Sequence, residues 1–167
     1  TGGLSERGFE VLNEVEHLQN EKARLNQQLQ GYVKDEATLQ PWGNFEPQSL
    51  RNLHDAGMNI GFYIAPERSY KEEWEEKYNA VVISRIASKV HFITITKIGE
   101  DIDLDVEHVK LPAHSLSKVK EQIEATEKAL EENTTALSVL AAKDVASVKV
   151  AIKQLHNDIE FSKVLLN

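Results

Sequence analysis

Apolar residues recur at seven-residue spacing in the first forty positions of the chain and again after residue 114. The first series is Leu4, Val11, Leu18, Leu25, Tyr32 and Leu39. The second series is Leu116, Ile123, Leu130 and Leu137, with Val119 beside it. This spacing is typical of helices that pack along an apolar seam. The pattern therefore predicts two long helices separated by a different kind of structure.

The ends of these helices are marked by local signals. Ser5 is a candidate N-cap for the first helix, and Pro41 disfavours helix at Gln40, so the helix is expected to end there. Ser115 is a candidate N-cap for the second helix. After Leu137 the apolar series shifts by four residues, a stutter that locally unwinds a supercoil. The shifted series is Val145, Ile152, Ile159 and Leu166.

The intervening segment mixes two periodicities. Pro47 to Ala56 reads as a short helix that ends at Gly57, and a second, glutamate-rich helix is expected over 66–77. Runs rich in β-branched residues, or with alternating apolar and polar residues, predict four strands. The first three lie at 58–65, 80–85 and 89–97, and the fourth begins at Ile102 and is expected to end by Leu111-Pro112. The predicted fold class is α+β, with a small α/β lobe inserted between two long antiparallel coiled-coil helices. The expected domains are a first arm at 1–40, the lobe at 41–112 and a second arm at 113–167.

Composition narrows the class of partner. The 167 residues carry 27 Asp and Glu against 19 Lys and Arg, a net charge of −8. Nucleic acid and anionic membrane surfaces select basic proteins, so neither is an expected partner. The chain has no Cys, which excludes disulfides and thiolate metal sites. No apolar run approaches the roughly 20 residues that span a bilayer, so no membrane insertion is expected.

No catalytic, cofactor-binding or metal site is expected. Asp101, Asp103, Asp105 and Glu107 resemble a calcium loop only superficially, because Val106 stands where that loop needs glycine. A strand with an acidic side is the better interpretation of this segment. His108 and His114 are interpreted as exposed loop residues rather than metal ligands.

Two groups of residues are candidates for structural and binding roles. A platform on which bases stack could be formed by Trp42, Phe45, Trp74 and Tyr78. The absence of interleaved basic residues instead favours structural anchors, namely Trp42, Phe45 and Trp74. Trp42 in particular should be buried where the first arm meets the lobe. The glutamate-rich helix offers an acidic surface to basic residues of a protein partner. Its residues are Glu67, Glu72, Glu73, Glu75 and Glu76.

Several motifs in a fixed order suggest a family. Residues 41–45 read Pro-Trp-Gly-Asn-Phe directly after the first helix, and residues 74–79 read Trp-Glu-Glu-Lys-Tyr-Asn. Residues 82–86 and 90–95 follow as apolar strands, and Leu111-Pro112 precedes the return of the helical pattern. Together they resemble the inserted lobe of subunit I of bacterial and archaeal V/A-type rotary ATPases, called subunit a in eukaryotes.

The resemblance implies a non-catalytic stator component of a proton- or sodium-translocating ATPase. The implied partners are the peripheral-stalk subunits and the membrane half of the same polypeptide. The implied location is the cytoplasmic face of the membrane. The arginine of the ion pathway belongs to the membrane half, so no catalytic residue carries over to this chain.

Two other interpretations remain open. A globular segment between coiled arms is also found in the coiled-coil hinge or scaffold domain of a chromosome-maintenance-type ATPase, although the acidic balance opposes DNA binding. An enzyme is the third interpretation, and no constellation of residues supports it.

Overall fold

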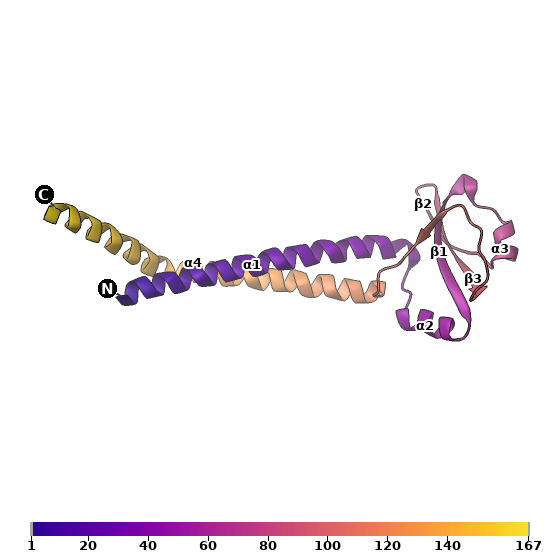
Figure 1. Ribbon diagram of the computed structural model, residues 1–167, viewed down its shortest axis with the longest axis horizontal. Coiled ribbons are helices and arrows are strands. Elements are labelled where there is room, and N and C mark those ends of the chain that lie inside the picture. Colours follow the sequence, from indigo (N-terminus) through magenta and orange to yellow (C-terminus); the bar gives the residue numbers. More distant parts are fainter. Residues whose placement is uncertain (1, 167) are drawn as a thin grey trace. The chain divides into compact units, whose positions relative to one another are not determined.

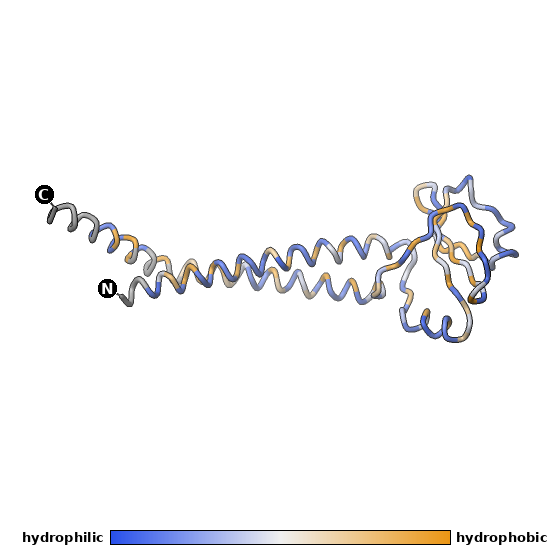
Figure 2. Tube along the Cα trace, in the orientation of Figure 1, coloured by the Kyte–Doolittle hydropathy of each residue, from blue (hydrophilic) through white to orange (hydrophobic). Residues whose placement is uncertain are grey.

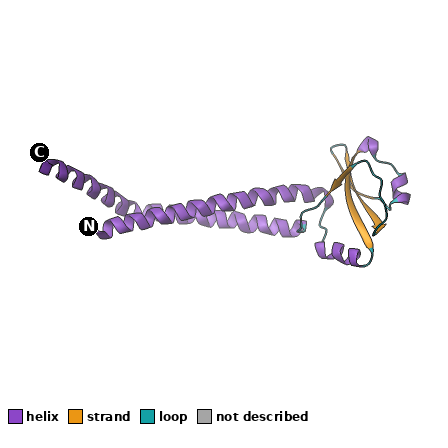
Figure 3. Cartoon of the chain, in the orientation of Figure 1, coloured by secondary structure: helices purple, strands orange, loops and turns teal. Residues whose placement is uncertain are grey.

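A computed structural model describes the backbone of residues 2–166, and the side chains of residues 6–142, 145, 149–150 and 152–157. It contains long helices and a four-stranded antiparallel sheet, which confirms the α+β class (Figures 1 and 3). The elements are α1 (Gly2–Leu39), η1 (Gln40–Trp42), α2 (Pro47–Asp55), β1 (Met58–Pro66), η2 (Glu67–Ser69), α3 (Glu73–Lys77), β2 (Val81–Ile86), β3 (Lys89–Lys97), β4 (Glu107–Val109) and α4 (Leu116–Leu166).

The chain divides into two compact units. One contains residues 31–123, and the other contains residues 1–30 together with 124–167. Each unit combines a segment of α1 with a segment of α4, because both helices run from one unit into the other. The two units are described separately below.

The sheet of the 31–123 unit has the strand order β2-β3-β1-β4. β1 and β3 pair along their whole length, from Met58 opposite Lys97 to Pro66 opposite Lys89. β2 and β3 form a hairpin whose two turn residues, Ala87 and Ser88, have φ of 51° and 62°. Two central residues with positive φ form the type I′ turn, which matches the twist of the flanking strands. The short strand β4 pairs only with Phe62 to Ile64 of β1.

Side chains alternate between two buried faces of this sheet, as the period of two along a strand requires. The Phe92 face carries Tyr63, Ala65, Val90 and Phe92 and is covered by Trp74 and Tyr78. The Trp42 face carries Phe62 and Ile93 and is covered by Trp42, with Phe45 and Leu50 packed beside them. Figure 2 shows that the strands of this sheet contain many hydrophobic residues.

Two elements expected from the sequence differ in the structure. The helix expected over 66–77 is a 3-10 turn followed by the five-residue α3. The strand expected from Ile102 onward is confirmed only over β4, because residues 102–106 form no strand, although Ile102, Leu104 and Val106 still pack on the Phe92 face. The Asp103 N–H donates to the Tyr78 hydroxyl at 3.2 Å. The backbone of this segment is therefore bound by a side-chain hydroxyl and not by a neighbouring strand.

The helix ends of the 31–123 unit pack against each other. Leu39, Leu116 and Val119 form a buried cluster, with Tyr32 and Ile123 packed against it. The Ser115 hydroxyl accepts a hydrogen bond from the Lys118 N–H at 3.2 Å, so Ser115 caps α4 as predicted. Pro47 begins α2, and Gly57 follows its end with φ of 90°, again as predicted.

The second unit consists of helical segments alone. Val11 and Leu25 of α1 and Thr126, Asn133 and Leu140 of α4 are buried. The seam on α4 thus includes two polar residues that the apolar series did not contain. α1 begins at Gly2, so the prediction of Ser5 as its N-cap is wrong.

Farther along α4 the apolar side chains of the shifted series are exposed. Val145 is 46% exposed and Ile152 is 62% exposed. Leu4, Ile159 and Leu166 lie outside the described side chains. Among the residues that the structure describes, no helix is both long enough and apolar enough to cross a membrane.

Candidate partner-binding surfaces

The predicted anchor Trp42 lies at the centre of the Trp42 face. Its side chain is 2% exposed, and its ring meets Phe62 edge-on at 5.3 Å between centroids and His91 at 5.1 Å. The Ser84 hydroxyl donates to the Pro41 carbonyl at 2.8 Å, which ties the turn before Trp42 to β2. Phe45 is half-buried and meets Phe62 edge-on at 5.3 Å. Trp42 therefore joins the end of α1 to the sheet.

Trp74 lies on the opposite, Phe92 face. It stacks on Phe92 at 5.5 Å and meets Tyr70 edge-on at 5.4 Å. Because Trp42 and Trp74 lie on opposite faces of one sheet, they cannot form a single stacking platform. This geometry favours the interpretation of these aromatics as structural anchors.

Three buried or half-buried titratable groups in the lobe have pKa values shifted by their surroundings. Burial raises the pKa of Tyr63. Burial is also the main cause that raises the pKa of Tyr70, and the negative charge of the nearby Glu75 raises it further. Burial lowers the pKa of His91, whose Nδ1 has no hydrogen-bond partner among the described residues. Tyr63 and His91 lie on different faces of the sheet, so they do not converge on one reacting position.

No group of three His, Asp or Glu side chains in the described part of the chain is placed to hold a metal ion. The ring of His108 stacks on Tyr63 at 4.8 Å, whereas His114 lies in the exposed linker before α4.

The first candidate partner-binding surface is the one predicted from the glutamates, here called the glutamate surface. It consists of Glu67, Glu72, Glu73, Glu75 and Glu76, all exposed. Glu67 pairs with Arg85 at 3.5 Å, and Glu75 accepts a hydrogen bond from the Tyr70 hydroxyl at 3.3 Å. The same segment contains Arg68, Lys71 and Lys77, so it carries a moderate excess of negative charge.

The second surface was not predicted. It is a groove of about 560 Å³ beside α2, here called the α2 groove, and it lies within the 31–123 unit. Its apolar lining includes Phe45, Leu50, Ile60, Phe62 and Leu111. Its other lining residues include Arg51, Lys110 and His114. The sequence signal was the apolar pair Leu50 and Leu53 on one side of α2, but nothing local showed that residues 109–114 would lie beside it.

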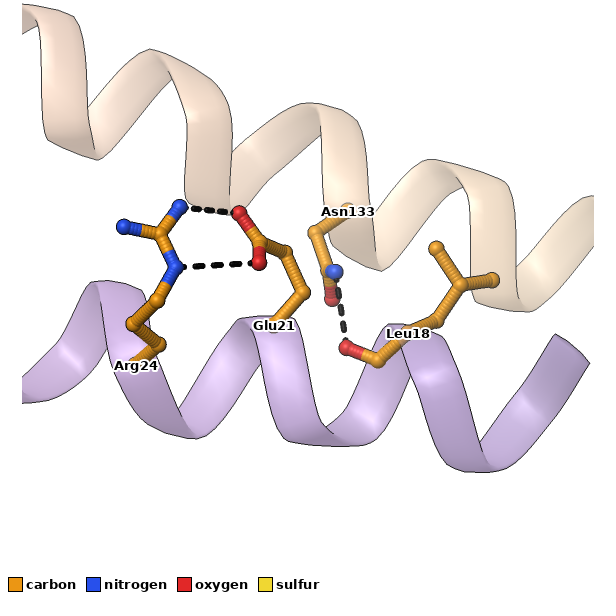
Figure 4. A network of polar contacts seen from close by, with 4 residues as sticks. All are labelled: Leu18, Glu21, Arg24 and Asn133. Carbon is orange, nitrogen blue, oxygen red and sulfur yellow. Dashed lines mark hydrogen bonds and ion pairs between the residues drawn. The ribbon is translucent and has the colours of Figure 1, made fainter.

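A third feature that sequence reasoning missed is a polar contact in the helical unit. The Asn133 side-chain amide donates to the Leu18 carbonyl at 2.9 Å, which joins a segment of α4 to a segment of α1 (Figure 4). One turn along α1, Glu21 and Arg24 form an ion pair, and the Arg24 guanidinium lowers the pKa of the Glu21 carboxyl. The available signal was that Thr126 and Asn133 are the polar members of a second seven-residue series, which begins at Val119 and continues to Leu140.

Comparison of the chain with known protein families, with curated proteins and with solved structures finds no match.

Proposed function

We propose that this chain is a non-catalytic stator element of a V/A-type rotary ATPase, corresponding to the distal lobe and part of the coiled coil of subunit I. In this proposal α1 and α4 form an antiparallel coiled coil that carries the lobe. The lobe binds the peripheral-stalk subunits, and the rest of the polypeptide supplies the membrane half. The protein would then work at the cytoplasmic face of the membrane, in ion transport.

The observation that carries the proposal is the pairing of α1 with α4 in each unit. In the 31–123 unit, Tyr32 and Leu39 pack with Leu116 and Val119. In the helical unit, Asn133 bonds to Leu18 across 115 positions of sequence. A chain that leaves along one helix and returns along another is suited to a strut, because paired helices resist bending better than a single helix.

The resemblance at residues 41–45 adds a second support. The Pro-Trp-Gly turn is where α1 ends and where Trp42 enters the Trp42 face, so it is the mechanical joint between helix and lobe. A stator must transmit force through such a joint without local bending. A buried aromatic ring packed on two neighbouring rings provides that stiffness.

Titration calorimetry of the full chain against the purified peripheral-stalk heterodimer tests the proposal. We expect micromolar or weaker binding, because an intact motor holds several such contacts at once. Binding should weaken as salt rises from about 50 mM to about 500 mM, since exposed charges are screened. Replacing Glu72, Glu73 and Glu76 by Lys should weaken it further.

A matched control is the reversal of Arg51 to Glu, which lies on the other side of the sheet and should leave stalk binding unchanged. The proposal fails if no heat is seen at high micromolar concentrations of both proteins. A mobility shift of DNA at low salt would instead favour the hinge of a chromosome-maintenance-type ATPase.

A further inference from the structure

The α2 groove differs in charge from the rest of the chain. The whole sequence has a net charge of −8. The structure describes every residue of the lobe, and none of the residues that line this groove is Asp or Glu. Arg51 and Lys110 line it together with His114. The Arg51 guanidinium donates to the neutral Gln48 carboxamide at 2.8 Å, and no ion pair of Arg51 is found among the described residues. The positive charge at the groove is therefore available to a partner.

The apolar part of the groove is incompletely covered. Phe45, Leu50, Ile60 and Leu111 are all half-buried, although they belong to or pack on the core of the Trp42 face. A volume of about 560 Å³ lies in the range of natural binding pockets. Apolar side chains are left partly open beside cations that form no ion pair among the described residues, and this pattern is expected where a partner adds the missing apolar contacts.

From this geometry we infer that the α2 groove binds an acidic amphipathic helix of a partner protein. The nine residues of α2 are about 13 Å long, so a helix laid beside it would contact it over about two and a half turns. Helices bind such grooves through apolar residues at positions i, i+3, i+4 and i+7. Acidic residues flanking these anchors would meet Arg51 and Lys110.

Negative charge beside the α2 groove decides where the acidic residues of a partner would lie. Glu46 and Glu121 line a neighbouring hollow that shares Arg51 and His114 with the groove. Acidic partner residues are therefore expected mainly at the Lys110 end, which these two carboxylates do not line, and on the groove side of Arg51. The glutamate surface follows β1 and lies with α3 on the Phe92 side of the sheet, so the lobe presents surfaces of opposite charge on its two sides.

The test uses the full chain and two designed peptides of about 16 residues. Both have Leu or Phe at i, i+3, i+4 and i+7, and the remaining positions are rich in Glu in one peptide and in Lys in the other. We expect the Glu peptide to bind and to shift the backbone NMR signals of Leu50, Ile60 and Leu111. The Lys peptide should bind at least about tenfold more weakly at this site.

Variants separate this site from the rest of the surface. Arg51→Glu should weaken the Glu peptide at least about tenfold, whereas Glu73→Lys, on the other side of the sheet, should leave its affinity unchanged. Circular dichroism of Arg51→Glu checks that the exposed substitution leaves the fold intact. Stalk binding, which depends on Glu73 rather than Arg51, can fail or succeed independently of this result.

Any of four outcomes would overturn the inference, and the first three concern peptide binding. They are equal affinity for the two peptides, NMR shifts confined to residues outside the groove, and unchanged affinity in Arg51→Glu. Self-association of the chain that Arg51→Glu abolishes would also overturn it, because the occupant would then be a second copy.

Discussion

The side-chain amide of Asn133 donates a hydrogen bond to the backbone carbonyl of Leu18 at 2.9 Å. Asn133 is buried, and its own carbonyl oxygen has no partner among the described residues. A polar residue in an apolar seam lowers stability, but it opposes other registers, in which its amide would be buried without an acceptor. We therefore interpret Asn133 as the residue that sets how α1 and α4 align in the helical unit.

Replacing Asn133 by Leu should raise the free energy of unfolding by about 1 kcal/mol, because an unpaired amide oxygen is removed and apolar area is buried. The variant should also lose the unique alignment of α1 with α4, because no buried amide then opposes other registers. New oligomers in analytical ultracentrifugation would reveal this loss. The exposed neighbour Thr134, replaced by Leu, serves as the control and should change neither property. A large loss of stability in Asn133→Leu would show that the hydrogen bond matters more than the orphaned oxygen.

Trp42→Ala should lower the free energy of unfolding by about 3–5 kcal/mol, the usual cost of deleting a fully buried large aromatic side chain. Urea denaturation measures this loss. The ring's burial can be checked directly by iodide quenching of fluorescence, using Trp74→Phe to leave Trp42 as the only tryptophan. Strong quenching in the native protein would contradict the position described for the ring.

Gly61→Ala should lower the free energy of unfolding by about 1–3 kcal/mol through overpacking. A Cβ at this position would lie 2.6 Å from Cε2 of the Tyr63 ring and 2.7 Å from the Thr94 hydroxyl oxygen. Gly31→Ala is the matched control, since a Cβ there meets nothing within 4 Å and the residue lies inside α1. It should raise stability by about 0.5–1 kcal/mol, the cost of glycine in a helix. Similar effects at the two sites would be inconsistent with this packing.

Stability should fall on acidification partly because of His91. Burial lowers the pKa of this imidazole in the folded protein, and the nearby charge of Lys89 lowers it further, whereas Glu107 opposes the shift. Below about pH 6.5 the unfolded chain takes up a proton at His91 that the folded chain still excludes, so stability is lost as pH falls through the folded pKa. Above the unfolded pKa the contribution is fully present.

The comparison of His91→Gln with the parent chain tests this assignment. The variant should lose less stability than the parent between about pH 7.5 and about pH 5, because its side chain does not titrate. Urea denaturation at both pH values gives the four free energies required. An identical pH dependence in the two proteins would rule out His91 as a contributor.

The sequence by itself determined the elements whose signals are local. The strands β1, β2 and β3 follow from runs of β-branched residues. α2 follows from Pro47 at its start and Gly57 after its end, and Ser115 marked the beginning of α4. The burial of Trp42 was also predictable, because a helix-ending proline and a glycine on either side hold its ring close to the lobe.

Only the tertiary structure decided how these elements meet. Apolar and acidic residues alternate from Ile102 to Val106, as they would in a strand. This alternation indicates which side chains face the core, but it does not indicate whether the backbone pairs with a neighbouring strand. In the structure, that backbone bonds to the Tyr78 hydroxyl instead. The strand order, which places β1 between β3 and β4, likewise depends on contacts distant in sequence.

The candidate surfaces divide in the same way. The glutamate surface could be read from composition, since charged residues on a short segment rarely become buried. The α2 groove could not, because its lining combines α2, β1 and residues 108–114, which only folding brings together. The contact of Asn133 with Leu18 joins positions 115 residues apart, and no pattern within either helix states which carbonyl the amide will meet.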